Sequence, residues 1–139
     1  MAAASGPEGT HVITCVFRAM DDHAGDASVQ AQACGALRNM AGNDSLRLAI
    51  IKAGGVPRIV RAMARHGADA NVQEAAVRAL KNLSHVDFDV QRKAGTAKGL
   101  VRQVASAVSA PNATAITKQK GAQLLELLYV SAFCVRTRV

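Results

Sequence analysis

The segment RAMDDHAGDASVQ at residues 18–30 decides the fold, because it returns as RAMARHGADANVQ at residues 61–73. Eight of its thirteen positions are identical in the two copies, and the offset is 43 residues throughout. The correspondence continues in register as far as Asn39 and Asn82. A repeat with a period of about 40–47 residues is typical of arrays whose units contain two or three helices. The repeat therefore predicts a helical array that organises most of the chain.

The composition also favours helices over strands. Half of the 139 residues are hydrophobic, yet aromatic residues make up only 3% of the chain. Alanine rather than aromatic residues supplies much of the expected core, and bulky strand-forming residues are scarce. A chain of this length forms one domain or one short array. We therefore predict an all-α protein.

Glycine, proline and short polar residues divide the array into its helices. Residues 1–10 are expected to be a flexible tail, and Asp26 or Ser28 is expected to cap the second helix. The segment Asn43-Asp44-Ser45 is expected to break the chain and cap the next helix, and Pro57 falls in a first helical turn. The expected helices end near residues 22, 42, 53, 66, 85, 95 and 109, and a last helix starts near residue 113.

The net charge of +7 permits two interpretations. The basic residues are scattered from Arg18 to Arg138 without a dense run, which is typical of a solvated helical surface. An excess of positive charge also attracts acidic partners, whether peptides or nucleic acids. Nucleic-acid binding is the weaker of these alternatives, because aromatic residues that stack on bases are nearly absent and no basic cluster forms a phosphate track.

The three cysteines, Cys15, Cys34 and Cys134, are too few and too far apart for a disulfide framework, and no Cys-x-x-Cys pair is present. We predict reduced thiols and a cytoplasmic location, with the nucleus as the alternative. The first ten residues lack the apolar core of a signal peptide. The apolar stretch 124–135 is interrupted by Glu126, so no membrane insertion is expected.

No catalytic motif stands out. The sequence has no Gly-x-x-x-x-Gly-Lys-Ser/Thr loop, no His-Glu-x-x-His and no convincing nucleophile–base pair. We therefore expect a non-enzymatic protein without catalytic residues, metal ligands, cofactor or small-molecule substrate. His23 and His66 stand at equivalent helix ends, where interaction with the helix C-terminus is the expected role.

Three short segments of the repeat carry two motifs. Residues 52–60 (KAGGVPRIV) place a Gly-Gly break before a helix that opens with proline, while residues 36–41 (ALRNMA) and 79–84 (ALKNLS) close long helices. Together these motifs resemble the armadillo repeat. The resemblance implies a right-handed α-α superhelix, an armadillo-type solenoid of about three repeats. Its expected parts are a tail (1–10), a partial first repeat lacking its first helix (11–42), a complete repeat (43–86), a degenerate terminal repeat (87–133) and a second tail (134–139).

The resemblance also implies a function. In this family the third helices line a concave groove that grips extended peptides, and a groove asparagine bonds the peptide backbone. That asparagine matches Asn39 and Asn82, whereas the third equivalent position is Glu126. The expected function is a protein-interaction scaffold that binds an extended, acidic or phosphorylated segment. The expected groove residues are Asn39, Asn82, Arg38, Arg78 and Lys81. The alternative for each is an ordinary solvent-exposed polar residue.

The ends of the array raise the prospect of self-association. Lys120 and Gln123 replace the packing residues Ala76 and Ala79, which suggests a terminal unit whose outer face meets water. The first unit lacks a helix, and the last helix is apolar on several sides. We therefore expect a homo-oligomer, a continuation of the array or a tail that folds back. The apolar residues in question are Leu125, Leu128, Tyr129, Val130 and Phe133.

Overall fold

The computed structural model describes the backbone of residues 7–84 and 99–137, and the side chains of residues 9–84 and 99–128. This part of the chain forms helices and contains no strand, which confirms the all-α prediction. The helix expected near residues 87–95 lies outside the described residues. The helices are α1 (Pro7–Asp22), α2 (Ala27–Met40), α3 (Asp44–Lys52), α4 (Gly55–Arg65), α5 (Ala70–Leu83), α7 (Leu100–Ser109) and α8 (Ala115–Thr137).

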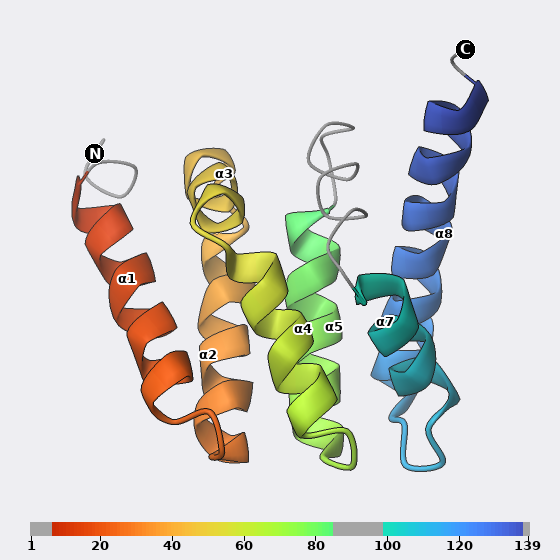
Figure 1. Cartoon of the computed structure of the whole chain (residues 1–139), viewed down its shortest axis with the longest axis horizontal. Coiled ribbons are helices and arrows are strands. Elements are labelled where there is room, and N and C mark those ends of the chain that lie inside the picture. Colours follow the sequence, from red (N-terminus) through yellow and green to blue (C-terminus); the bar gives the residue numbers. More distant parts are fainter. Residues whose placement is uncertain (1–6, 85–98, 138–139) are drawn as a thin grey trace.

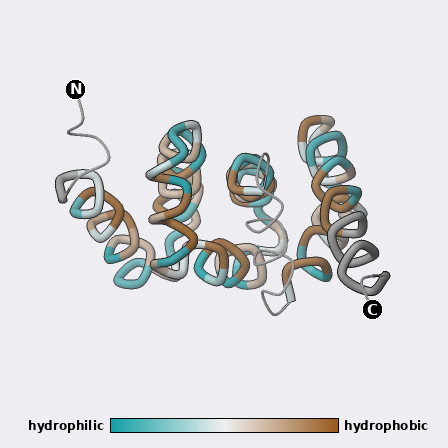
Figure 2. The backbone as a smooth tube through the Cα atoms, turned by 90° about the horizontal axis from the view of Figure 1, so that it is seen from above, coloured by the Kyte–Doolittle hydropathy of each residue, from teal (hydrophilic) through white to brown (hydrophobic). Residues whose placement is uncertain are grey.

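The helices stand in two rows (Figures 1 and 2). Helices α2, α5 and α8 pack side by side, and we refer to them as the third-helix row. Helices α1, α4 and α7 form the other row, and each packs against the helix of the third-helix row that follows it in the chain. The short helix α3 contacts α1, α2 and α4. This arrangement is the solenoid that the repeat predicts.

One continuous core lies between the two rows. Leu37, Leu80 and Leu124 occupy equivalent positions on the three helices of the third-helix row, and all three are fully buried. The repeat offset thus places large apolar side chains on the same inward face in every unit, as helical periodicity requires. The apolar face of α5 is completely buried, whereas Val29, Ala36 and Met40 on α2 are only half-buried; the residues of the α5 face are Val72, Ala76, Ala79, Leu80 and Leu83. In the described part of the chain, no helix of the third-helix row packs on the side of α2 that faces away from α5.

Short polar residues and one glycine set the helix boundaries. Asp26, Asn43 and Asp69 each accept a hydrogen bond from the backbone N–H three residues later, at 3.2, 3.1 and 3.0 Å. These bonds satisfy N–H groups that have no partner within the helix, and they confirm the predicted caps at Asp26 and Asn43. Gly54 has a φ of 89°, a left-handed conformation that glycine adopts easily, and it allows the sharp turn from α3 into α4.

Both predicted tails are too long. Helix α1 begins at Pro7, so residues 7–10 belong to a helix. Proline is favourable as a first helical residue because the N–H it lacks would have no helical partner there. Helix α8 continues to Thr137, so residues 134–137 are also helical. After Gly121 no glycine or proline interrupts α8, and helices propagate readily once nucleated.

The apolar surface expected on the last helix is partly buried. Leu128 belongs to the core and is 3% exposed, because it lies one turn beyond the inward-facing Leu124. The expectation that Leu128 contributes to an exposed apolar surface for self-association is therefore wrong. The side chains of Tyr129, Val130 and Phe133 lie outside the described residues, and self-association stays a prediction.

Candidate functional site

The two repeat copies share a buried glutamine that bonds the end of the preceding helix. Gln30 donates from Nε2 to the backbone carbonyls of Met20 (3.1 Å) and His23 (2.8 Å). Gln73 makes the same two bonds, to Met63 (3.0 Å) and His66 (2.9 Å). Both glutamines are buried, and each satisfies carbonyls at the C-terminal end of the preceding helix. The repeated glutamine therefore holds the two helices of one unit together through main-chain carbonyls of the preceding helix end.

The side chain of His66 also takes part in this junction. The Nε2 atom of His66 lies 2.8 Å from the carbonyl oxygen of Ala24, in the turn between α1 and α2 of the preceding unit. His66 therefore links neighbouring units in addition to closing α4. Within residues 9–84 and 99–128, no group of three His, Cys, Asp or Glu side chains is arranged to hold a metal ion.

A small hollow with a strongly basic lining lies across the third-helix row. Its lining residues are Arg38 from α2, then Arg78, Lys81 and Asn82 from α5, and Lys120 from α8. All five are half-buried, and the hollow has a volume of about 120 Å³. Side chains from three successive helices therefore converge on one place, which we call the basic hollow.

The charge of the basic hollow is uncompensated among the described residues. The ion pairs found among the described residues join Arg47 to Asp44 and Arg58 to Asp21, so neither uses a cation of the hollow. Partial burial lowers the pKa of Lys81 from its ordinary value of 10.5, and the adjacent ammonium of Lys120 lowers it further. Two positive charges are thus held close together, and the lining residues of the hollow include no carboxylate.

Asn82 connects two helices of the third-helix row. Its Nδ2 donates to the backbone carbonyl of Arg38, 3.2 Å away at the end of α2. The bond uses part of the hydrogen-bonding capacity that the family resemblance assigns to a bound peptide. It also fixes the backbone that carries the Arg38 side chain.

The structure brings together four of the five residues predicted for the groove. Arg38, Arg78, Lys81 and Asn82 line the basic hollow, but Asn39 does not. Asn39 is exposed on α2. Its counterpart Asn82 reaches back to the preceding third helix, and in the described part of the chain no such helix precedes α2.

Lys120 is the lining residue that sequence reasoning missed. The repeat register places it at the position of the buried Ala76, which suggested a side chain on an outer face. Instead it is half-buried and lies next to Lys81. A long lysine stem can run along apolar surface and carry its charge to a wetter place. A lone lysine at a repeat position otherwise held by alanine was the available signal.

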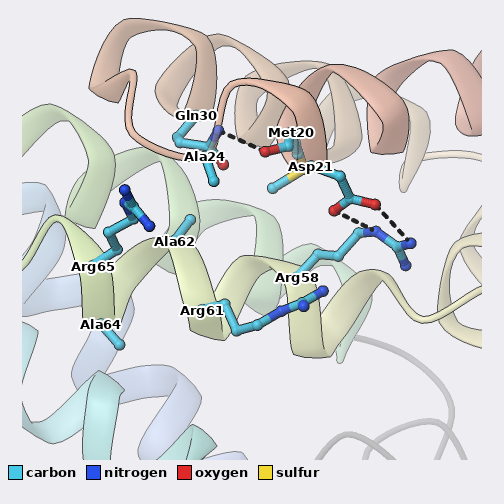
Figure 3. Close-up of a pocket in the computed structure, with 9 residues that line it drawn as sticks. All are labelled: Met20, Asp21, Ala24, Gln30, Arg58, Arg61, Ala62, Ala64 and Arg65. Carbon is cyan, nitrogen blue, oxygen red and sulfur yellow. Dashed lines mark hydrogen bonds and ion pairs between the residues drawn. The ribbon is translucent and has the colours of Figure 1, made fainter.

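A larger hollow lies between α1 and α4 (Figure 3). It measures about 600 Å³ and contains a carboxylate, since Arg58 bonds Asp21 through Nε at 3.3 Å and through its Nη2 atom at 3.1 Å. The Arg58 guanidinium also lies 4.5 Å from the centre of the Phe17 ring. We call it the α1–α4 hollow. Its lining is Met20, Asp21, Ala24, Gln30, Arg58, Arg61, Ala62, Ala64 and Arg65.

The comparisons agree with this architecture. Residues 43–85 match the family model described as Armadillo/beta-catenin-like repeat. The matched segment contains α3, α4 and α5, which form one complete unit of three helices. No curated protein and no solved structure matched the chain. None of the described helices combines the length and the apolar character needed to cross a bilayer. Residues 43–85 are similar to the armadillo repeat, and this match supports an armadillo-like repeat architecture for the chain.

Proposed function

We propose that the chain is a non-enzymatic scaffold that binds an extended acidic segment of a partner protein along the third-helix row. Armadillo repeats generally mediate protein binding. The observation that carries the acidic preference is the basic hollow, where four half-buried cations meet without a carboxylate among the described residues. Burial of unpaired charges raises the free energy of the unbound protein, and an anionic partner offsets that cost.

The dimensions of the row suit an extended segment. Neighbouring packed helices are separated by roughly 8–10 Å, so the axes of α2 and α8 are about 16–20 Å apart. An extended chain advances about 3.3 Å per residue, so roughly six residues span the row. A segment of this length meets Arg38 on α2, Arg78 and Lys81 on α5, and Lys120 on α8. Such a short contact supports modest affinity, on the order of micromolar.

The two asparagines take different roles in this proposal. Asn82 is a positioning residue, because its bond to the Arg38 carbonyl holds α2 and α5 together under the basic hollow. Asn39 contributes only when the bound segment continues past α2, since Asn39 is exposed there and does not line the hollow. The specificity of the site therefore comes from the cations.

The experiment measures the binding of fluorescent peptides to the whole chain by anisotropy, at low and high salt. Peptides of about ten residues that are rich in aspartate and glutamate should bind, while neutral and basic peptides of equal length should not. The double variant Arg78→Gln/Lys81→Gln should weaken the binding of acidic peptides at least tenfold and make their affinity less dependent on salt concentration. The matched control is Arg61→Gln/Arg65→Gln, which removes the same charge from the α1–α4 hollow.

Two results would overturn this function. Peptides bound without regard to charge would remove the acidic preference. Equal weakening by both double variants would show that net charge, and not the basic hollow, attracts the ligand. The net charge of +7 makes nucleic acid the alternative ligand, so duplex and single-stranded oligonucleotides belong in the same assay. Binding of oligonucleotides more tightly than acidic peptides would favour that alternative.

A further inference from the structure

We propose that His11 and Cys15 on α1 bind a zinc ion, and that the same two residues of a second copy of the chain complete its tetrahedral coordination. Neither residue lines the basic hollow or the α1–α4 hollow. The zinc site is therefore independent of the proposed peptide site, and it gives the chain a metal-dependent way to form a dimer.

The side chains of His11 and Cys15 face each other across one helical turn. The Nε2 atom of His11 lies 3.8 Å from the Sγ atom of Cys15. In tetrahedral zinc sites the Zn–N bond is about 2.0–2.1 Å and the Zn–S bond about 2.3 Å, so a nitrogen and a sulfur on the same ion lie roughly 3.6 Å apart. The observed separation is close to this value. Both side chains can therefore bind one ion with only a small adjustment.

Helical periodicity brings the pair together and turns it outward. Residues four apart lie on the same face of a helix, one turn above the other. The opposite face of α1 carries Ile13, Phe17 and Met20, which are buried in the core. His11 and Cys15 are both exposed. The pair therefore projects into solvent, where a metal ion and a second protein molecule can reach it.

The chemistry of the two ligands favours zinc. Thiolate and imidazole are common zinc ligands, whereas calcium and magnesium take oxygen ligands. The Cys15 thiol releases its proton when it binds the ion, and the imidazole binds through an unprotonated nitrogen. When Nε2 of His11 binds the metal, Nδ1 carries the ring proton. Cys-x-x-Cys is absent from the sequence, but a histidine four residues before a cysteine on a helix is a different ligand spacing.

One chain supplies only half of such a site. Structural zinc sites almost always have four protein ligands. Within residues 9–84 and 99–128, no group of three His, Cys, Asp or Glu side chains could hold a metal ion. A twofold contact uses the same surface on both molecules, so a second copy brings an identical pair to the ion. The result is a site with two cysteine and two histidine ligands.

Charge also favours the second copy. One thiolate leaves a bound zinc ion with a net charge of +1, on a chain whose own net charge is already +7. Two thiolates, one from each chain, make the zinc centre neutral. The symmetric site therefore avoids adding positive charge to the protein, which a site on a single chain does not.

The surroundings of the pair suit an approach by another molecule. Helix α1 stands at one end of the array and packs against α2, α3 and α4 with its other sides (Figure 1). Val12 lies beside the pair and is 50% exposed. Contact between two α1 helices would remove this side chain from water, which favours association. The metal and the apolar contact thus act in the same direction.

The test uses Co²⁺ as a spectroscopic probe and Zn²⁺ as the competing ion. The whole chain is kept reduced and carries no affinity tag, because tag histidines bind the same ions. Tetrahedral Co²⁺ bound by thiolate has a charge-transfer band that the hydrated ion lacks. We expect this band to reach its maximum at one Co²⁺ per two chains and to disappear when Zn²⁺ displaces Co²⁺. Light scattering should show a twofold rise in molar mass with Zn²⁺, reversed by EDTA.

Four variants locate the ligands. Cys15→Ser should abolish the charge-transfer band, and His11→Gln should weaken the binding of Co²⁺ at least tenfold. Neither variant should double its mass with Zn²⁺. The matched controls are Cys134→Ser and His23→Gln, which remove a cysteine and a histidine outside the pair and should behave as the parent chain. His23 is exposed just beyond the end of α1. Circular dichroism verifies that all four variants remain folded.

Three outcomes would overturn the proposal. The first is the absence of a thiolate–cobalt band in the parent chain. The second is a band that Cys134→Ser reduces as strongly as Cys15→Ser does. The third is one ion per chain without a change in molar mass, because the remaining ligands would then not come from a second copy. Binding of acidic peptides to Cys15→Ser should equal that of the parent chain, so the peptide function is tested separately.

Discussion

Asn82 on α5 donates a hydrogen bond to the backbone carbonyl of Arg38 at the end of α2, across a distance of 3.2 Å and 44 residues of sequence. The bond joins consecutive units of the solenoid at the edge of the basic hollow. Its repeat counterpart Asn39 is exposed and lies outside the basic hollow. Two identical residues at equivalent repeat positions therefore have different surroundings, and this difference can be measured.

Replacing Asn82 with alanine should lower the free energy of unfolding by about 0.5–1.5 kcal/mol, because one intramolecular hydrogen bond is lost. The equivalent change Asn39→Ala should stay within about 0.5 kcal/mol of the parent protein, since surface substitutions usually do. Urea unfolding of the two variants provides the comparison. Equal effects at the two positions would mean that the bond to Arg38 contributes nothing to stability.

Replacing Gln73 with alanine should destabilise the protein more strongly, by about 1–3 kcal/mol, because one buried and one partly buried carbonyl lose their donor. These carbonyls belong to Met63 and His66 at the end of α4. Gln119→Ala on the exposed side of α8 is the control and should be nearly neutral. Thermal unfolding monitored by circular dichroism measures both. A neutral Gln73→Ala would show that water replaces the amide at no cost.

A methyl group at Gly121 should destabilise the packing of α7 against α8. A Cβ atom there would overlap Cγ2 of Val108, so the Val108 side chain or the helices would have to shift. Overpacking of this kind typically costs about 1–3 kcal/mol. Gly35→Ala on α2 is the control, because a Cβ there meets nothing within 4 Å. That control should stabilise the helix by about 0.5–1 kcal/mol.

The double variant Gly121→Ala/Val108→Ala tests whether overlap with Val108 causes the destabilisation by Gly121→Ala. Removing the Val108 methyl groups should recover much of the stability lost through Gly121→Ala, when compared with Val108→Ala alone. The measurement is a double-mutant cycle of unfolding free energies. Additive effects would place the origin of the destabilisation elsewhere than in this contact.

Cys34 should resist alkylation while Cys15 reacts. Burial raises the pKa of the Cys34 thiol to about 12, and the reactive thiolate is therefore nearly absent at neutral pH. Cys15 is exposed. Intact-mass analysis after iodoacetamide treatment at pH 8 should show slow labelling of Cys34, which accelerates when urea opens the fold. Rapid labelling of Cys34 in the native protein would contradict the burial.

The Cys34 thiol should also make the free energy of unfolding depend on pH in the alkaline range. The ordinary thiol pKa is 9.0 and the folded value is about 12, so the folded state holds this proton more tightly. The corresponding stabilisation is complete below about pH 9 and is lost as the pH rises toward 12. Cys34→Val, which installs the residue of the equivalent position Val77, should flatten this part of the profile. An unchanged slope would exclude Cys34 as its source.

The sequence alone determined the elements of the fold because they depend on local spacing. The 43-residue offset indicated the array, and the same offset relates Leu37 to Leu80, which are both buried in the core. Short acceptor side chains identified the starts of α2 and α3, since a cap bonds an N–H only three residues away. The ends of the chain were predicted less well, because the apolar pattern does not extend to the first residues of α1.

Only the tertiary structure decided the composition of the basic hollow and the meaning of the repeated glutamine. The spacing of residues defines the faces of one helix, but it does not define how far a neighbouring helix is shifted along its axis. That shift depends on how side chains pack between helices. It brought Lys120 next to Lys81, which the repeat register did not predict. It also brought the Nε2 of Gln73 within reach of two carbonyls at the end of α4. These bonds join two helices, so no pattern within one helix predicts them.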